Sequence, residues 1–225
     1  MEGEYKVKET PHMRKLYIDI QSQLFYMIPE SFEKIYVYAA IMDQVHGMPI
    51  GEMFFYYLPK GILKKKPVNV YEIPNKFNIE EDVYSKMINK LYEYIKELRQ
   101  EAIASGQKPW TNITISIEDF KFYIEYNYDD LTQSPYSNYE RHIIWRYKYL
   151  QTDINSYNKK ERQLLYKYLS EEKEERKDVH QENIYANKKK KVIAFDTNKE
   201  AREAEIEAEK IENEMQVNQI LDVKK

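Results

Sequence analysis

Two neighbouring segments that alternate apolar and polar residues constrain the fold of this chain most. Residues 111–117 (TNITISI) place three isoleucines on one side, and residues 120–128 (FKFYIEYNY) alternate in the same way. A period of two is typical of strands that bury one face. Because only residues 118–119 separate the two segments, they are predicted to pair as an antiparallel hairpin.

Three further strands are predicted between residues 35 and 73. Residues 35–42 (IYVYAAIM) and 52–58 (EMFFYYL) are rich in residue types that favour strands. Residues 67–73 (PVNVYEI) show the alternation of a half-buried strand. Residues 43–51 contain two glycines and a proline, and they are predicted to form a hairpin loop.

Two predicted helices flank these strands. Residues 12–28 carry apolar residues at helical spacing, and Pro29 is predicted to end this helix. A second helix is predicted to begin where Asn78 and Glu81 form a pair like a capping box, and to end at Gly106. Its predicted apolar stripe consists of Val83, Met87, Leu91, Tyr94 and Leu98.

Two more helices are predicted after the hairpin. One begins near Ser137, where Glu140 is placed to complete a capping box, and the other begins near Asn158. The resulting order of elements is α-βββ-α-ββ-α-α, without a βαβ repeat. This order predicts an α+β fold with a mainly antiparallel sheet of about five strands.

The character of the chain changes near residue 170. Residues 171–225 contain 12 Lys or Arg and 15 Asp or Glu, which leaves 23 residues of each sign in residues 1–170. Charge blocks with few apolar anchors are usually solvated or disordered. We therefore predict an α+β domain at 1–170 and a charged, partly helical or disordered tail at 171–225. Within this tail, residues 197–221 have the pattern of a helix with a thin apolar stripe.

Composition limits the class of protein. The 225 residues are 42% hydrophobic, which is enough for a core, and no run approaches the roughly 18 apolar residues of a membrane span. The polar N-terminal residues lack the apolar region of a secretory signal, so we expect a cytoplasmic protein. The absence of cysteine excludes disulfides, thiolate zinc sites and cysteine nucleophiles.

Motifs for cofactors are also missing. The chain has five glycines and no glycine-rich phosphate loop. Its four histidines lie far apart in sequence and lack the spacing of a known metal site. We therefore predict that the protein uses neither a cofactor nor a metal.

One group of side chains has the composition of an acid–base site. Glu125, Asp129 and Asp130 are close in sequence to Glu140 and His142. Glu140 is better explained as part of a helix cap, which weakens this interpretation. A small hydrolase that uses the first three carboxylates remains an alternative. A scaffold protein that acts through its C-terminal helix is a second alternative.

The charge and tyrosine content of residues 111–140 favour a binding surface instead. This segment has six acidic residues and one lysine, a net charge of −5 within a body that has no net charge. Its five tyrosines are interleaved with the acids. Such a surface suits a basic partner, because charge steers the encounter and buried aromatic rings supply affinity. The same pattern also fits tyrosines that pack inward beside acids that solubilise an edge strand.

Five segments resemble one protein family. They are MIPESFEKIYVYAAI (27–41), YEIPNKFNI (71–79), PWTNITISI (109–117), FYIEYNYDDL (122–131) and YERHIIWRYKYL (139–150). Taken together, they are similar to the YezG/EsaG-type immunity proteins. These are antitoxins of bacterial polymorphic toxins linked to LXG proteins and type VII secretion. The resemblance covers residues 12–170.

The resemblance implies a non-enzymatic inhibitor that binds a cognate toxin inside the producing cell, without direct contact to nucleic acid or membrane. The toxin domain in this family is often a nuclease, and such a domain is expected to be basic because it binds a polyanion. The predicted contacts are Tyr126, Asn127, Tyr128, Asp129, Asp130, Tyr136, Tyr139 and Glu140. Arg141 and Trp145 are predicted to be structural, and the oligomeric state stays open.

Overall fold

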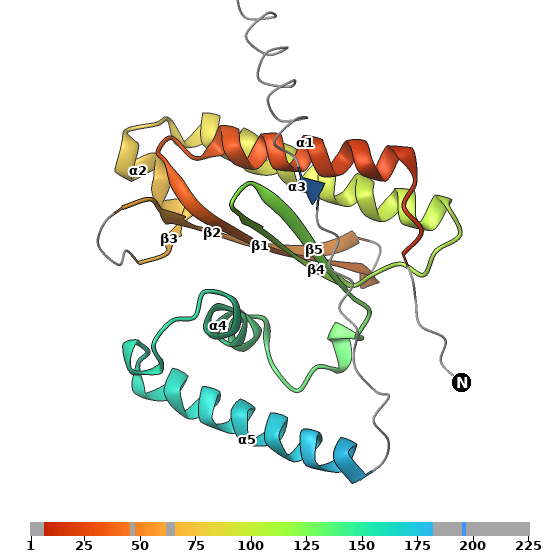
Figure 1. Ribbon diagram of the computed structural model, residues 1–225, viewed down its shortest axis with the longest axis vertical. Coiled ribbons are helices and arrows are strands. Elements are labelled where there is room, and N and C mark those ends of the chain that lie inside the picture. Colours follow the sequence, from red (N-terminus) through yellow and green to blue (C-terminus); the bar gives the residue numbers. More distant parts are fainter. Residues whose placement is uncertain (1–6, 46–47, 62–65, 182–194, 197–225) are drawn as a thin grey trace, which may run out of the picture.

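The computed structural model describes residues 7–45, 48–61, 66–181 and 195–196. In this part of the chain, an antiparallel sheet lies between two layers of helices (Figure 1). The strands are β1 (Phe32–Val45), β2 (Met48–Pro59), β3 (Val68–Asn69), β4 (Asn112–Glu118), β5 (Lys121–Asn127) and β6 (Phe195–Asp196). The helices are α1 (Pro11–Met27), α2 (Ile73–Phe77), α3 (Glu81–Ala104), α4 (Asn138–Tyr149) and α5 (Lys159–Gln181). The strand order is β3-β2-β1-β4-β5-β6, and the predicted α+β class is confirmed.

The hairpin predicted from the two alternating segments is present as β4 and β5. A two-residue turn joins the strands, and both of its residues have positive φ angles, 49° at Asp119 and 61° at Phe120. This geometry matches the right-handed twist of paired strands. The three isoleucines of β4 are fully buried on one face, as predicted.

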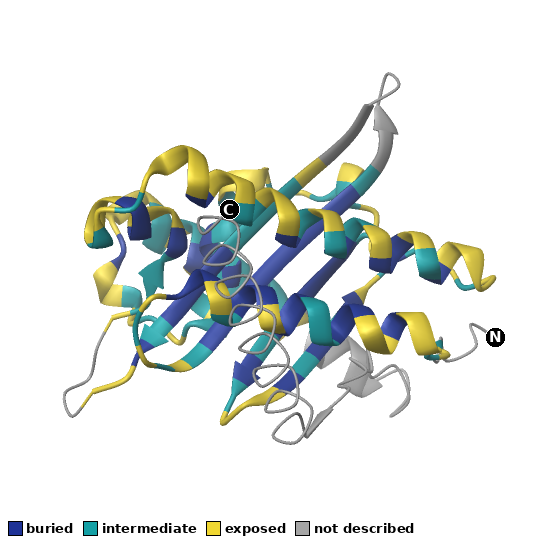
Figure 2. Ribbon diagram, turned by 90° about the horizontal axis from the view of Figure 1, so that it is seen from above, coloured by how far each residue is buried: buried dark blue, intermediate teal, exposed yellow. Residues whose placement is uncertain are grey.

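The main core lies between this face of the sheet and the pair α1 and α3. Figure 2 shows the two helices side by side across the strands, with their buried residues turned toward the sheet. Ile20 and Leu24 of α1 and Leu91, Ile95 and Leu98 of α3 are completely buried there. Burial of this apolar area is the largest favourable contribution to folding.

The opposite face of the sheet is aromatic rather than aliphatic. Its core cluster contains Tyr36 and Tyr38 of β1, Tyr56 of β2 and Trp145 of α4. Helix α5 packs on α4 through Leu165, on the side away from the sheet (Figure 1). The sheet is therefore covered on both faces, by α1 and α3 on one and by α4 on the other.

The strand predicted at 67–73 is mostly incorrect. Only Val68 and Asn69 pair with β2, and a 3-10 turn and the short helix α2 follow directly. The Asn69 side chain accepts a hydrogen bond from the backbone N–H of Tyr71 at 3.1 Å, which turns the chain away from the sheet. Pro74 then lies in the first turn of α2, where a proline is tolerated.

The predicted start of the long helix also needs correction. Asn78 does not cap α3. It ends α2 in the left-handed conformation, with φ at 53°, and α3 begins at Glu81 without a side-chain cap. The predicted stripe is confirmed at Leu91 and Leu98, which are fully buried, but its start is wrong: Tyr84 is 1% exposed and donates to the carbonyl of Met27, whereas Val83 is 40% exposed.

Residue 170, where the charged tail is predicted to begin, lies inside helix α5. Helix α5 runs without interruption to Gln181. Sequence patterns did not predict strand β6. Its two residues pair with Lys121 and Phe122 of β5. The helix predicted at 197–221 lies outside the described residues.

The hairpin of β1 and β2 is longer than predicted, because β1 continues to Val45 and β2 begins at Met48. Gly51, which was expected in a loop, lies in β2 opposite Ile41. A Cβ atom at Gly51 would meet the Tyr92 hydroxyl oxygen at 1.4 Å and the adjoining ring carbon at 2.5 Å. The glycine therefore makes room for a ring of α3.

We predict that Gly51→Ala lowers the free energy of unfolding by about 1–3 kcal/mol, because the Tyr92 ring must move out of a packed position. Urea titration of the purified variant measures this loss. The matched background is Tyr92→Leu, in which the clash is absent and Gly51→Ala should cost much less. An equal cost in both backgrounds would contradict the packing role of Gly51.

Candidate partner-binding surface

The predicted contact residues are concentrated in the segment that joins β5 to α4, which we call the acidic connector (residues 127–140). It leaves the end of the sheet and passes to the helical layer on the aromatic face (Figure 1). Asn127, Asp129 and Asp130 are exposed there. The structure therefore brings most of the predicted contacts onto one continuous surface segment.

Local hydrogen bonds give the connector a defined shape. The Asn127 side chain accepts from the Asp129 N–H at 2.8 Å. The Asp130 carboxylate accepts from the N–H and the hydroxyl of Thr132 at 2.9 and 2.7 Å, and so caps a 3-10 turn at Leu131–Gln133. These two bonds lower the pKa of Asp130, because they stabilise its charged form.

The three tyrosines of the connector take different positions. Tyr128 is half-buried, with the Lys108 ammonium 5.7 Å from its ring centre. Tyr136 contacts α5, where its hydroxyl donates to Glu171. Tyr139 is 61% exposed, and its hydroxyl donates to Glu161 at 2.8 Å. Of the three, Tyr139 offers the largest free aromatic surface.

Tyr126 does not belong to this surface. Its side chain is 7% exposed and turned into the main core, where its hydroxyl shares a 2.7 Å hydrogen bond with the hydroxyl of Tyr17. Burial raises the pKa of Tyr126 well above its ordinary value. The prediction that Tyr126 contacts a partner is inconsistent with this burial, and the residue is a core residue instead.

Glu140 forms the predicted capping box at the start of α4. One of its carboxylate oxygens accepts from the backbone N–H and the hydroxyl of Ser137 at 2.8 and 2.9 Å, and the Ser137 hydroxyl accepts from the N–H of Glu140. These bonds lower the pKa of Glu140. The carboxylate stays charged at the helix N-terminus, where a negative charge is favourable.

Arg141 attaches the end of the connector to the sheet. Its guanidinium donates to the carbonyl of Tyr136 at 3.0 Å, to Asn138 at 2.6 Å and to Glu52 of β2 at 3.2 Å. The Arg141 and Glu52 side chains are only 14% and 12% exposed. Burial raises the pKa of Glu52, and Arg141 opposes that shift. The predicted structural role of Arg141 agrees with these contacts.

His142 and Trp145 bind α4 to the aromatic face of the sheet. The His142 ring stacks on Phe54, with centres 3.9 Å apart, and its Nε2 is 2.9 Å from the Tyr56 hydroxyl. The Trp145 indole N–H donates to the Thr114 hydroxyl at 3.1 Å. Sequence reasoning treated Trp145 as structural but missed the face that it packs on. The signal that could have identified this face is the pair of tyrosines at alternate positions of the predicted strand at 35–42.

The carboxylates proposed for a hydrolase serve other contacts. Of the three carboxylates proposed for it, Glu125 accepts from the Tyr149 hydroxyl at 2.9 Å and Asp130 caps its turn, while the neighbouring Glu140 caps α4. The His142 ring stacks on Phe54, and its Nε2 contacts the Tyr56 hydroxyl. In the described parts of the chain, no group of three or more His, Cys, Asp or Glu side chains is suited to a metal ion.

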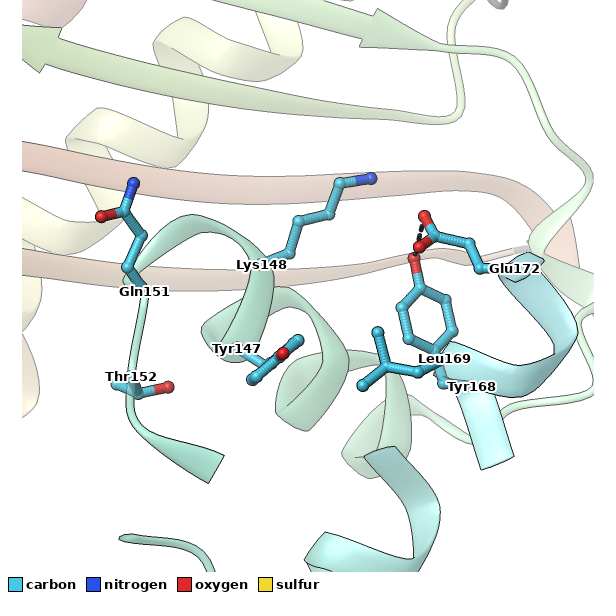
Figure 3. A pocket seen from close by; sticks show the side chains of 7 residues that line it. All are labelled: Tyr147, Lys148, Gln151, Thr152, Tyr168, Leu169 and Glu172. Atoms are coloured by element: carbon cyan, nitrogen blue, oxygen red, sulfur yellow. Dashed lines mark hydrogen bonds between the residues drawn. The ribbon is translucent and has the colours of Figure 1, made fainter. Parts of the chain in front are cut away.

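A shallow hollow of about 460 Å³ lies between the end of α4 and α5 (Figure 3). It is lined by Tyr147, Lys148, Gln151, Thr152, Tyr168, Leu169 and Glu172. The Tyr168 hydroxyl donates to Glu172 across its rim at 3.0 Å. None of the predicted contact residues lines this hollow, so it is separate from the acidic connector.

The family model of YezG-like immunity proteins matches residues 13–164. The chain belongs to this family. The match begins within α1 and ends within α5, so it includes the acidic connector, and residues 165–225 lie outside it. Among the described helices, none is long and apolar enough to cross a membrane.

Three relatives extend the comparison. "Immunity protein YezG" of Bacillus spizizenii is 35% identical over 143 residues, which are 63% of this chain and 84% of the relative. "Immunity protein YezG" of Bacillus subtilis is 32% identical over 139 residues, 61% of this chain and 87% of the relative. "Type VII secretion system protein EsaG" of Staphylococcus aureus is 28% identical over 138 residues, 60% of this chain and 80% of the relative.

The buried position of Tyr126 gives a first prediction for this YezG-like protein. Tyr126→Phe removes the hydrogen bond to Tyr17 and should lower the free energy of unfolding by about 1 kcal/mol. Tyr139→Phe, on the exposed surface, is the matched control and should change stability little. Urea titration compares the two variants. A larger loss for Tyr139→Phe would contradict the assignment of Tyr126 to the core.

A second prediction concerns acid stability. Burial, with a smaller contribution from the charge of Arg146, lowers the pKa of His142 from 6.5 to about 4. The unfolded chain therefore takes up a proton at this residue below about pH 6.5, whereas the folded protein does so only near pH 4. Stability from His142 is fully present above pH 6.5 and is lost as the pH falls toward 4.

We expect the free energy of unfolding of His142→Gln to fall less steeply with decreasing pH, because glutamine does not bind a proton in this pH range. The free energy of unfolding is measured for both proteins from neutral pH down to about pH 4. The difference at neutral pH gives the cost of the replacement itself, and the difference in slope isolates the titration. Equal slopes would show that folding does not lower the pKa of His142.

Proposed function

We propose that this chain is an immunity protein that binds a cognate secreted toxin within the producing cell and keeps it inactive by stoichiometric contact. Membership of the YezG-like family carries this proposal. The names of the relatives support it, since two are immunity proteins and the third is a protein of a type VII secretion system. Under this proposal the protein acts by binding rather than by catalysis.

The acidic connector is the surface that we propose for the toxin. Asp129 and Asp130 are exposed next to each other, and the lowered pKa of Asp130 keeps its carboxylate charged. An acidic surface attracts a basic partner over a distance and accelerates association. A nuclease domain fits this requirement, because it must bind a phosphate backbone and is expected to be basic there.

The fixed shape of the connector supports the same proposal. One end continues from β5, and the other end is tied to β2 through Arg141 and to α5 through Tyr136. Because the segment is held in place before binding, less conformational entropy is lost on association. The proposed contacts are Asn127, Tyr128, Asp129, Asp130, Tyr136, Tyr139 and Glu140.

Reversal of charge tests this surface. Asp129→Lys with Asp130→Lys should slow association with the toxin domain encoded beside this chain by about tenfold or more at low salt, and should reduce the salt dependence. Glu81→Lys with Asp82→Lys makes the same change of charge at the exposed start of α3, on the other face of the sheet, and should have a much smaller effect. Surface-coupled binding kinetics measure both.

One further variant separates charge from structure. Asp130→Asn keeps an oxygen acceptor for Thr132 while removing the charge. It should slow association with the turn intact. If charge reversal at the connector leaves the association rate unchanged, the interface lies elsewhere. If the unaltered protein forms no complex with the toxin and toxicity persists, the immunity function itself is wrong.

A further inference from the structure

The hollow between the end of α4 and α5 has walls that are mainly apolar and aromatic. Tyr147 contributes a ring from α4, and Tyr168 and Leu169 contribute a ring and an aliphatic side chain from α5. Figure 3 shows Leu169 between the two rings. All three side chains are half-buried, so part of each remains accessible to solvent. Such walls suit an apolar side chain, which gains by leaving water.

The hollow adjoins the acidic connector, although the two have different residues. The ring of Tyr168, which lines the hollow, meets the ring of Tyr136 edge to face, with centres 6.2 Å apart. The Tyr136 hydroxyl donates to Glu171, and the next residue, Glu172, lines the hollow. A partner bound to the connector at Tyr136 therefore reaches the hollow by passing over a single ring.

The distribution of charge shows what kind of segment fits the two surfaces together. The lining of the hollow has one lysine, Lys148, and one glutamate, Glu172, so it carries no net charge. Residues 171–174 (EEKE) beside it have three acids and one lysine, and they continue the acidic surface of the connector. A basic segment is thus attracted to the surroundings of the hollow, while an uncharged side chain fits its interior.

We propose that the hollow between α4 and α5 accepts a large apolar side chain of the toxin, carried by a basic segment that also contacts the acidic connector. This inference rests on the proposed function and specifies the chemistry of the partner. A large side chain that fills a pocket on the other protein is typical of the few contacts that dominate binding energy. The α5 wall of the hollow lies outside the family match, which ends at residue 164.

The two surfaces then affect different rate constants. Charge acts over a distance, so the acidic connector controls the association rate and its dependence on salt. Apolar contact acts only after the surfaces have met, so the hollow controls the dissociation rate, and salt has little effect on its contribution. This difference allows the hollow to be tested separately from the connector.

Binding kinetics of the full chain with the toxin domain encoded beside it provide the test. Leu169→Ala removes an apolar wall and Leu169→Trp fills the hollow, so each should raise the dissociation rate by about tenfold. The association rate should change by less than about twofold, at low and at high salt. Val83→Ala and Val83→Trp are the matched controls, because Val83 is 40% exposed on α3, on the other face of the sheet, and neither rate should change.

A second variant protects the test against misfolding at Leu169. Lys148 is exposed at the rim of the hollow, so Lys148→Trp should cover the hollow without altering the core or the contact of Tyr136 with Tyr168. It should also raise the dissociation rate by about tenfold. Unchanged dissociation of the folded tryptophan variants, or a change confined to association, would overturn the inference while the proposed function stands. If the unaltered chain does not bind the toxin, the proposed function fails and the inference fails with it.

Discussion

Polar contacts between α4 and the aromatic face of the sheet determine the position of the second helical layer. The Trp145 indole donates to Thr114, and Arg141 pairs with Glu52. A buried polar group that loses its partner destabilises the folded protein. These contacts are satisfied in one orientation of α4 and lost in others, so they select that orientation. An apolar interface alone would stabilise α4 with less selectivity. The acidic connector depends on this orientation, because α4 fixes its second end.

The two faces of the sheet therefore divide stability and specificity between them. The face toward α1 and α3 buries aliphatic side chains such as Ile113 and Ile115 and supplies the hydrophobic contribution. The face toward α4 uses tyrosine rings and hydroxyls, as in the contact of Tyr56 with His142. Tyrosine suits this face, since its ring packs while its hydroxyl finds a partner. The high tyrosine content of the chain has a structural explanation here, apart from any role in binding.

Sequence patterns predicted the elements whose signals are local. Alternation predicted the β4–β5 hairpin, and the pair of Ser137 and Glu140 predicted the start of α4. The failures occurred where a local signal had two structural meanings. Asn78 is a suitable N-cap, but its left-handed conformation ends α2 instead. Residues 67–73 alternate like a strand, yet the side chain of Asn69 turns the chain after two paired residues. Strand β6 depends on pairing between distant residues, which local patterns do not reveal.

The candidate surface shows the same distinction more sharply. The alternation that predicted β5 already placed Tyr126 on the same face as Phe122 and Ile124, and that face is the buried one. Tyr126 was predicted to be a contact because its segment is rich in acids and tyrosines, whereas the period of two predicts that its side chain is buried.

After β5 ends, alternation no longer assigns faces. Local hydrogen bonds then set the shape of the chain, and they leave the side chains of Asp129 and Asp130 exposed. The acidic connector is thus the part of the segment that the sheet does not use. Asp129 and Asp130 lie on this segment outside the core, so under the proposed function these contacts can change without disturbing the residues that stabilise the sheet.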